Sequence, residues 1–435
     1  MRRGVRPVED VGMHSAIDSA PTPAFADLME AVAPVADCFG AAGCRLYLVG
    51  GVVRDRLLGV DRTPDYDLTT DATPDVIRDI VANVADAMWL QGERFGTIGV
   101  RVSNTNMEIT THRAEAYLSD SRKPVVRYTT VLYDDLARRD FTVNAMAVDV
   151  TDGSLHDPFG GRADLVDRVL RTPLDPRDSF SDDPLRMLRA ARFLALYSLT
   201  AAEGLVDAAR SLVGRMDIVS VERIRDELLR LLEIEDPSRG FDLLDVMGLL
   251  PVILPDLTGF SLYERGRVVS LLKEAPNDPI VRLAILAQLA GGSQAFPKLS
   301  SSLRLSGRDA DRAQILLEGS DRISVLGDEP TDANIRRLAG FCGKRLDDVL
   351  VFAELLGRST TSLVKGVKRL RAAGELDDLG PALDGATVME ILGVGPGPAV
   401  GEAMVWLAEL RVEEGLLPLE ETRRRLIDWW ESTTA

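Results

Sequence analysis

The sequence contains few of the residues that build disulfide frameworks and zinc sites. Its 435 residues include only three cysteines and three histidines, at unrelated spacings: Cys38, Cys44, Cys342, His14, His112 and His156. An odd number of scattered cysteines favours reduced thiols over disulfides or a zinc site. The few histidines also exclude an added metal-dependent hydrolase domain, which needs several histidine ligands.

Long apolar runs and an excess of positive charge are also missing. No run approaches the ~20 apolar residues of a membrane span. The first ten residues, MRRGVRPVED, have no apolar segment behind their arginines. We therefore expect a cytoplasmic protein with no signal peptide and no membrane contact. The net charge of −17 argues against a protein that coats nucleic acid indiscriminately, but it does not exclude RNA binding through a local patch.

The length indicates several folding units. At 435 residues the chain exceeds one ordinary hydrophobic core. We expect about three domains, or one compact domain followed by a helical array. Hydrophobic residues make up 46% of the chain and charged residues 27%, as in globular proteins.

One stretch, residues 46–70, has the pattern of a phosphate site. It begins with the apolar run LYLV, which predicts a short buried strand, and continues through Gly50-Gly51 into a helical turn with Arg54. Two glycines allow the backbone to approach an anion, the amides at a helix start attract it, and Arg54 adds a charged fork. The pattern therefore predicts a triphosphate site.

Two aspartates, Asp65 and Asp67, follow in the same stretch. In an extended segment their side chains lie on one side. Such a pair favours a divalent cation between the carboxylates, and oxygen ligands suit Mg²⁺. A double glycine or an Asp-x-Asp alone is usually an ordinary turn or loop, but the ordered combination is far more specific.

Around this stretch the periodicity predicts an α+β domain. We expect a disordered tail over residues 1–22, a helix from Pro23 to about Gly40, a helix after Thr73-Pro74, and paired strands over residues 98–102 and 107–111. Residues 113–127 are polar without a clear period, which predicts a mobile loop, and residues 141–147 alternate as a buried strand. Beyond about Asp164 the pattern is helical throughout.

A second polar pattern lies in the helical part, in FSDDPLRMLRAARFLA. Asp183-Pro184 predicts a helix start, and Arg186, Arg189 and Arg192 then recur every three residues on one side of the helix. A cationic solvent face with an aspartate cap is the alternative interpretation.

In their order these motifs resemble the nucleotidyltransferase superfamily. The likeness is to the class II tRNA nucleotidyltransferases, which comprise the CCA-adding enzymes and their bacterial poly(A) polymerase relatives. The first motif of that family reads as two glycines, Val-Arg-Asp, Leu-Leu-Gly and Asp-x-Asp, and all of it is present between Gly50 and Asp67. The resemblance implies an α+β head of the polymerase-β superfamily type followed by an all-α neck, body and tail. It covers about residues 46–232 strongly and the C-terminal part weakly.

The resemblance also implies roles for further head residues. RRDFTVNAMA matches the family's second motif, by which Arg139 contacts the incoming nucleotide and Asp140 helps to fix the site. Glu108 is the candidate for a third catalytic carboxylate, and a solvent-facing edge-strand glutamate is an equally good interpretation. A full-length loop in the place of residues 113–127 is associated in the family with the switch from adding C to adding A.

The family's template motif is Glu-Asp-x-x-Arg, and this chain has DDPLR at residues 182–186, with a shorter first acid. By this resemblance Asp183 and Arg186 read the base, and Arg189 and Arg192 face the nucleotide. Cytosine and adenine each present an amino donor beside a ring-nitrogen acceptor, which fits one carboxylate and one guanidinium. Guanine and uracil present a carbonyl beside an N–H, so they would leave buried polar groups unpaired.

Positive charge returns near the C-terminus of this acidic chain. We expect RNA binding at a basic cluster composed of Lys365, Lys368, Arg369 and Arg371. The amides of the turn GVGPGP that follows can receive a phosphate, and a plain helix connector is the alternative. By resemblance, this segment corresponds to the tail that holds the tRNA elbow.

The sequence thus predicts template-independent addition of C, C and A to the tRNA 3′ end from CTP and ATP, with Mg²⁺ held by Asp65 and Asp67. Partial enzymes that add only CC or only A, and poly(A) polymerases, share the head motifs and remain alternatives. A catalytically silent RNA-binding relative would be expected to lack one of the two acids. A monomer and a dimer are both compatible with the sequence. The expected domains are a disordered tail (1–22), the catalytic head (23–163), a neck with the nucleotide-reading helix (164–250), a body (251–355) and a tRNA-binding tail (356–435).

Overall fold

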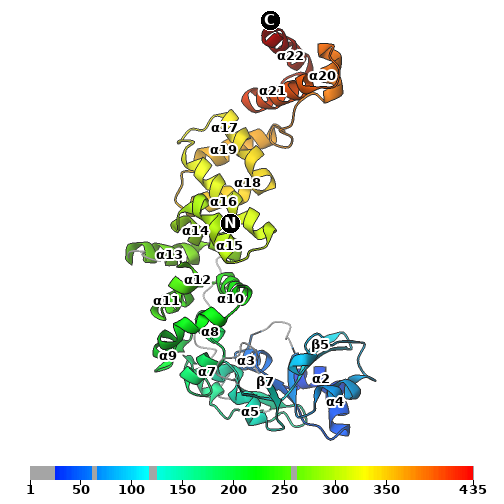
Figure 1. Cartoon of the computed structure of the whole chain (residues 1–435), viewed down its shortest axis with the longest axis vertical. Coiled ribbons are helices and arrows are strands. Elements are labelled where there is room, and N and C mark those ends of the chain that lie inside the picture. The colour runs from blue at the N-terminus through cyan, green and yellow to red at the C-terminus, as the bar shows by residue number, and fades with distance from the viewer. Residues whose placement is uncertain (1–24, 61–65, 117–124, 256–261, 435) are drawn as a thin grey trace. The chain divides into compact units, whose positions relative to one another are not determined.

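The computed structural model describes residues 25–60, 66–116, 125–255 and 262–434 (Figure 1). The chain divides into two compact units, Met1–Pro255 and Asp256–Ala435. The expected tail over residues 1–22 lies outside the described residues. The finer division into head, neck, body and tail stays a prediction. In the described ranges, no helix is long and apolar enough to cross a membrane.

The first unit is built on a seven-stranded sheet with the order β3-β4-β5-β2-β1-β8-β9. Within this sheet β2 and β5 run parallel, and the other neighbours are antiparallel. The predicted strands over residues 46–49, 98–102 and 107–111 are confirmed. The strands are β1 (Leu46–Val49), β2 (Tyr66–Thr70), β3 (Ala87–Trp89), β4 (Thr97–Val102), β5 (Thr105–Thr111), β8 (Ala147–Asp149) and β9 (Leu155–His156).

The two faces of the sheet have different coverings. On one side pack α2 (Ala26–Ala41) and α4 (Pro74–Val81), whose buried residues include Val32 and Ile77. Both helices match the predicted ones, and Pro74 occupies the first turn of α4. On the other side Tyr47 and Val49 form a core cluster with Leu136 of α5 (Leu132–Ala137). Side chains alternate along a strand, so Thr69, the partner of Tyr47, and Asp67 also lie on this second face.

Three local predictions are wrong. Residues 141–147 do not form one strand, because residues 142–144 make a 3-10 turn in which Thr142 donates to the Asp164 carboxylate (2.6 Å) and its N–H to the Arg171 carbonyl (2.8 Å). The ends of the expected loop pair as a hairpin of β6 (Arg113–Ala116) and β7 (Val125–Tyr128), and residues 117–124 lie outside the described residues. The part beyond Asp164 contains a small parallel pair of β10 (Val169–Leu170) and β11 (Thr200–Ala201).

Helices complete the first unit, and α8 lies at their centre. It packs against α7, α10 and α11. The sequence specifies these boundaries locally: Asp175 caps α7, which has Pro176 in its first turn, and the Ser220 hydroxyl accepts from the N–H of Arg223 at the start of α10. The helices are α3 (Gly51–Leu57), α6 (Gly161–Val166), α7 (Pro176–Asp182), α8 (Leu185–Leu196), α9 (Leu205–Leu212), α10 (Val221–Glu233), α11 (Ser238–Val246) and α12 (Leu250–Ile253).

The described part of the second unit is helical. Near its C-terminal end Trp429 packs against a core cluster and stacks on Trp406, with 5.2 Å between the ring centroids. The helices are α13 (Leu262–Glu274), α14 (Pro279–Leu289), α15 (Gly292–Ser302), α16 (Gly307–Ser324), α17 (Asp332–Cys342), α18 (Leu346–Leu355), α19 (Thr361–Ala372), α20 (Gly385–Leu392), α21 (Pro398–Glu414) and α22 (Leu419–Thr434).

Candidate active site

Two of the three predicted carboxylates lie side by side on the sheet. Asp67 of β2 and Glu108 of β5 are register partners in the parallel pair, and both are exposed. Partners in adjacent strands point to the same face, about 5 Å apart at the backbone. Asp65 lies outside the described residues. The alternation of the strand places Glu108 on the same face as the cluster around Val49, and the strand that carries it is internal to the sheet.

The acid pair suits a divalent cation. Two carboxylates at one register position repel each other, a divalent cation between them offsets this repulsion, and their oxygens are hard ligands. In the described ranges, no group of three His, Cys, Asp or Glu residues could hold a metal ion. The sequence places one further carboxylate, Asp65, two residues before Asp67. The metal site predicted at Asp65 and Asp67 therefore stays a prediction.

The double glycine forms the predicted turn between strand and helix. Gly50 has φ +73°, a conformation that side chains disfavour, and α3 begins at Gly51. A Cβ on Gly50 would lie 3.0 Å from Nη1 of Arg139. Arg139 and the glycine turn, which are distant in the sequence, are thus neighbours in the fold.

The position of Arg139 is set by Asp135 of α5. Arg139 donates from Nη2 to the Asp135 carboxylate (3.1 Å), and Arg138 donates from Nη2 (2.8 Å). The N–H of Arg113, at the start of the β6–β7 hairpin, also donates to it (3.1 Å). Burial alone would raise the pKa of Asp135, but Arg139 and Arg138 hold the pKa well below its usual range. Asp135 is therefore an anionic anchor for both arginines.

Arg54 lies inside the first unit. Its guanidinium donates to Asp55 (2.9 Å) and to the side-chain oxygen of Asn144, and it stacks on Tyr197 (4.5 Å) and Phe193 (5.3 Å) of the α8 region. These contacts connect α3 to α8. Its predicted role as a phosphate ligand stays a prediction, because the charge already has partners within the protein.

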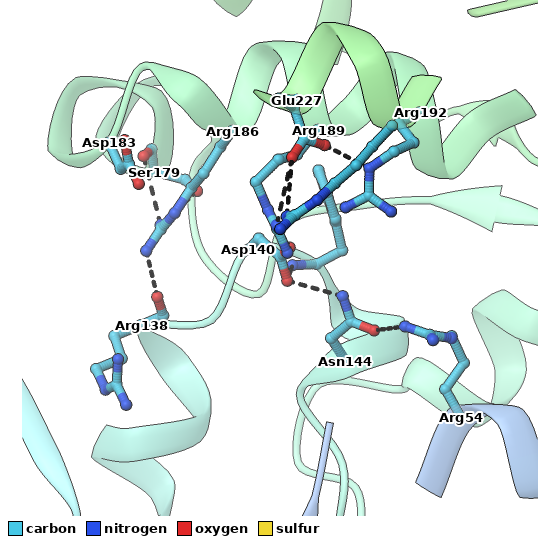
Figure 2. A network of polar contacts seen from close by, with 12 residues as sticks. Arg54, Arg138, Asp140, Asn144, Ser179, Asp183, Arg186, Arg189, Arg192 and Glu227 are labelled. Atoms are coloured by element: carbon cyan, nitrogen blue, oxygen red, sulfur yellow. Dashed lines mark hydrogen bonds and ion pairs between the residues drawn. The ribbon is translucent and has the colours of Figure 1, made fainter. Parts of the chain in front are cut away.

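Figure 2 shows how this connection continues to Asp140 and to helix α8. Asn144 donates to Oδ1 of Asp140 (2.9 Å), and Arg189 donates from Nε (3.0 Å) and Nη2 (2.5 Å) to Oδ2. Glu227 of α10 is only 3% exposed and contacts two arginines of α8. It accepts from Nε of Arg192 and lies 3.9 Å from Arg189. A continuous polar network thus extends from Arg54 to Arg192.

Acid should weaken this network at Asp140. Burial raises the pKa of Asp140, but Arg189 and the Asn144 amide outweigh it, and the net result is a pKa of about 2 instead of 3.8. Because its pKa is lower in the folded state, the ionised Asp140 carboxylate adds roughly 2 kcal/mol to the free energy of unfolding above about pH 4. This contribution is lost as the pH falls to about 2. The free-energy difference in unfolding between wild type and Asp140→Asn should shrink by that amount between pH 5 and pH 2, in urea denaturation of the full chain. A constant difference would contradict the charge pairing.

The two predicted base-reading residues are held in place by protein groups. Arg186 is 9% exposed, and it donates from Nη1 to the Ser179 hydroxyl (2.9 Å) and from Nη2 to the Arg138 carbonyl. Asp183 accepts from the Leu185 N–H at Oδ1 (3.2 Å) and from Nη2 of Arg223 at Oδ2 (2.8 Å). In the alternative interpretation, the cationic solvent face is wrong because Arg186 is buried, whereas the Asp183 contact with the Leu185 N–H agrees with an aspartate at the helix start.

The predicted RNA-binding cluster lies on α19, in the second unit. Arg369 pairs with Asp332 and Arg371 with Asp347, so these two arginines brace α19 against neighbouring helices. Lys365 and Lys368 are exposed and form no ion pair with any residue in the described ranges. The freely presented charge of the cluster thus belongs to the lysines.

Four residues of the site were missed by the sequence analysis: Asn144, Asp135, Glu227 and Arg223. Asn144 lies within RRDFTVNAMA and could have been found as a polar residue inside a buried segment. Glu227 and Arg223 are one turn apart on α10 and look like ordinary charges of an amphipathic helix. Only the packing of α10 against α8 reveals their partners.

A mixed sheet with paired acids beside a glycine turn, extended by helices, defines a polymerase-β-type nucleotidyltransferase head. Residues 46–171 match the family described as Poly A polymerase head domain. Residues 200–260 match the family described as the probable RNA and SrmB-binding site of polymerase A. About half of the chain is similar in sequence to CCA-adding enzymes, and its fold is similar to that of a solved CCA-adding enzyme.

Two curated relatives and two solved structures illustrate this relationship. The chain is 38% identical over 216 residues to a CCA-adding enzyme of Staphylococcus aureus (49% of this chain, 52% of the relative) and 38% identical over 208 residues to one of Geobacillus (48% and 50%). The matched part thus spans about half the length of these relatives. The structure of the Bacillus stearothermophilus CCA-adding enzyme in complex with CTP gives a TM-score of 0.75 at 26% identity, covering 95% of this chain and 99% of the other. The Thermotoga maritima CCA-adding enzyme complexed with tRNA gives 0.68 at 18%, covering 96% and 98%, and shows the fold alone.

Proposed function

We propose that this protein is a tRNA nucleotidyltransferase that adds C, C and A to the tRNA 3′ end from CTP and ATP in the cytoplasm. The observation that carries the proposal is the register pairing of Asp67 with Glu108 on the sheet face that carries Val49, the residue before the glycine turn. The similarity to CCA-adding enzymes, including one solved with CTP, supports the choice of substrates.

In this proposal Asp65, Asp67 and Glu108 hold divalent metal, and Mg²⁺ suits their oxygen ligands. When bound, the metal lowers the pKa of the primer 3′-hydroxyl and neutralises charge on the leaving pyrophosphate. The amide of Gly51, at the start of α3, receives the triphosphate, and Gly50 supplies the turn that lets the backbone approach it. The nearby guanidinium of Arg139 completes this cradle.

Base choice is assigned to Asp183 and Arg186. The carboxylate accepts from the exocyclic amino group of C or A, and the guanidinium donates to the ring nitrogen. Because Arg186 is fixed by Ser179 and the Arg138 carbonyl, its donor geometry is set before the nucleotide arrives. Arg189 and Arg192 lie on the same helix, where Asp140 and Glu227 hold them by ion pairs. Asp140 acts by holding Arg189, and Arg54 acts through Asn144, which donates to Asp140.

Incubation with tRNA ending at its discriminator base tests the proposal. Each NTP is supplied alone, followed by CTP with ATP, and products are resolved at single-nucleotide length. The proposal predicts two additions with CTP and a third only when ATP is also present. Addition of C alone, of a single A, or of an A tract would instead identify a CC-adding enzyme, an A-adding enzyme or a poly(A) polymerase.

The α19 cluster is proposed to bind tRNA phosphates, with Lys365 and Lys368 making the contacts. The double variant Lys365→Glu/Lys368→Glu should weaken tRNA binding by about 10-fold or more at moderate salt and flatten its salt dependence, because fewer counterions are released. CTP affinity should not change. Filter binding at several salt concentrations measures this, with the exposed Lys344→Glu as the control. Equal tRNA affinity in wild type and the double variant would place the RNA site elsewhere.

A further inference from the structure

We propose that Arg223 of α10 is a specificity-determining residue, which orients the Asp183 carboxylate toward the base of the incoming nucleotide. This inference rests on the proposed function. Arg223 lies outside the DDPLR motif and is 40 residues from Asp183 in the chain. Its contribution is to position a reading group, and it does not itself contact the base.

The two contacts of Asp183 determine the plane of its carboxylate. Oδ1 accepts from the Leu185 N–H (3.2 Å) and Oδ2 from Nη2 of Arg223 (2.8 Å). A carboxylate offers about four lone-pair sites, so two remain for a ligand. The Asp183 side chain is 24% exposed, and therefore the remaining acceptor sites can be reached from solvent. The backbone N–H alone fixes one oxygen and leaves the second free to rotate.

Arg223 is itself well placed for this task. The hydroxyl of Ser220 accepts from its N–H at the start of α10, which fixes the backbone. Four residues later, on the same face of the helix, Glu227 holds Arg192 and Arg189. Helix α10 thus places the cation Arg223 beside Asp183. It also places the anion Glu227 beside the arginines of α8, as Figure 2 shows.

An exposed ion pair of this kind contributes little to folding. The Arg223 side chain is 53% exposed, so its removal should leave the unit folded. Its effect should instead appear in base choice. A carboxylate that can rotate accepts the C or A amino group less well, and it can turn away from the carbonyl of U or G, which reduces rejection of these bases.

The test is Arg223→Ala in the full chain, with Arg225→Ala on the same helix as the matched control. Arg225 pairs with its neighbour Asp226 (2.7 Å). We expect the kcat/KM ratios of CTP over UTP and of ATP over GTP to fall about 10-fold in Arg223→Ala. The control should keep them, and Arg223→Lys should recover part of the loss because a cation returns.

A double-mutant cycle separates orientation of Asp183 from other roles. In an Asp183→Ala background Arg223→Ala should have no further effect on the ratios. Unchanged ratios in the single variant, or an equal loss for correct and wrong nucleotides, would overturn the inference. So would weaker tRNA binding with intact discrimination, which would make Arg223 an RNA contact.

Equilibrium binding distinguishes failure of this inference from failure of the proposed function. Binding of CTP and UTP to wild type and Arg223→Ala requires no chemistry and no tRNA. If wild type prefers CTP and the variant loses that preference, the inference holds even when no tRNA is extended. If the two proteins bind both nucleotides alike, the inference is wrong even when wild type completes CCA.

Discussion

Replacement of Asp67 by alanine should abolish nucleotide incorporation, with a loss on the order of 10³-fold in kcat. The carboxylate shares a register position with Glu108, so its removal leaves the metal with too few oxygen ligands. Asp65→Ala should have the same effect, and Glu108→Ala a similar one if it is a third ligand. Binding of tRNA should persist in all three variants, because the residues proposed to contact RNA lie on α19.

Primer extension under single-turnover conditions measures this loss, and filter binding measures the tRNA affinity. The control is Asp75→Ala, an exposed aspartate of α4, which packs on the opposite face of the sheet and pairs with Arg78. Retention of more than a few per cent of the activity in both Asp65→Ala and Asp67→Ala would show that the metal lies elsewhere. Loss of activity in Asp75→Ala would point to a general loss of folding.

Local sequence signals predicted the elements that present the site. The LYLV run specifies β1, and the glycine pair specifies the start of α3. The alternation around Ile98 and Ile109 specifies β4 and β5, all without tertiary information. The parallel pairing of β2 with β5 was not predictable from these signals, since it joins segments about forty residues apart in the sequence. That pairing is what brings Glu108 to Asp67.

Buried charges limited the prediction further. The residues next to Arg54 in the sequence do not show that its guanidinium will contact Asn144 and Tyr197. The sequence shows Glu227 only as a charged residue of an amphipathic helix. Its burial results from the packing of α10 against α8. Whether an arginine can face a ligand or only stabilises the fold depends on its long-range ion pairs. These ion pairs depend in turn on how the helices pack.

Asp183 and Arg186, the pair proposed to read the base, give the second large expected effect. Arg186→Ala should remove the donor to the ring nitrogen, and Asp183→Ala the acceptor for the amino group. Each variant should slow incorporation of C and A and lower the kcat/KM ratios of CTP over UTP and ATP over GTP by 10² or more, because an unpaired polar group no longer penalises the wrong base. Ratios are the required measurement, since a general loss of activity affects all four nucleotides alike.

Both residues also have structural contacts, and these predict a different result. Asp183 accepts from the Leu185 N–H, and Arg186 holds Ser179 and the Arg138 carbonyl, so each variant should lose about 1 kcal/mol or more of stability. That loss lowers the melting temperature without changing base preference. Arg177→Ala, an exposed arginine of α7, controls for removal of charge near the site. If both variants melt earlier yet keep wild-type ratios, Asp183 and Arg186 serve only the fold, and base choice is made by other residues.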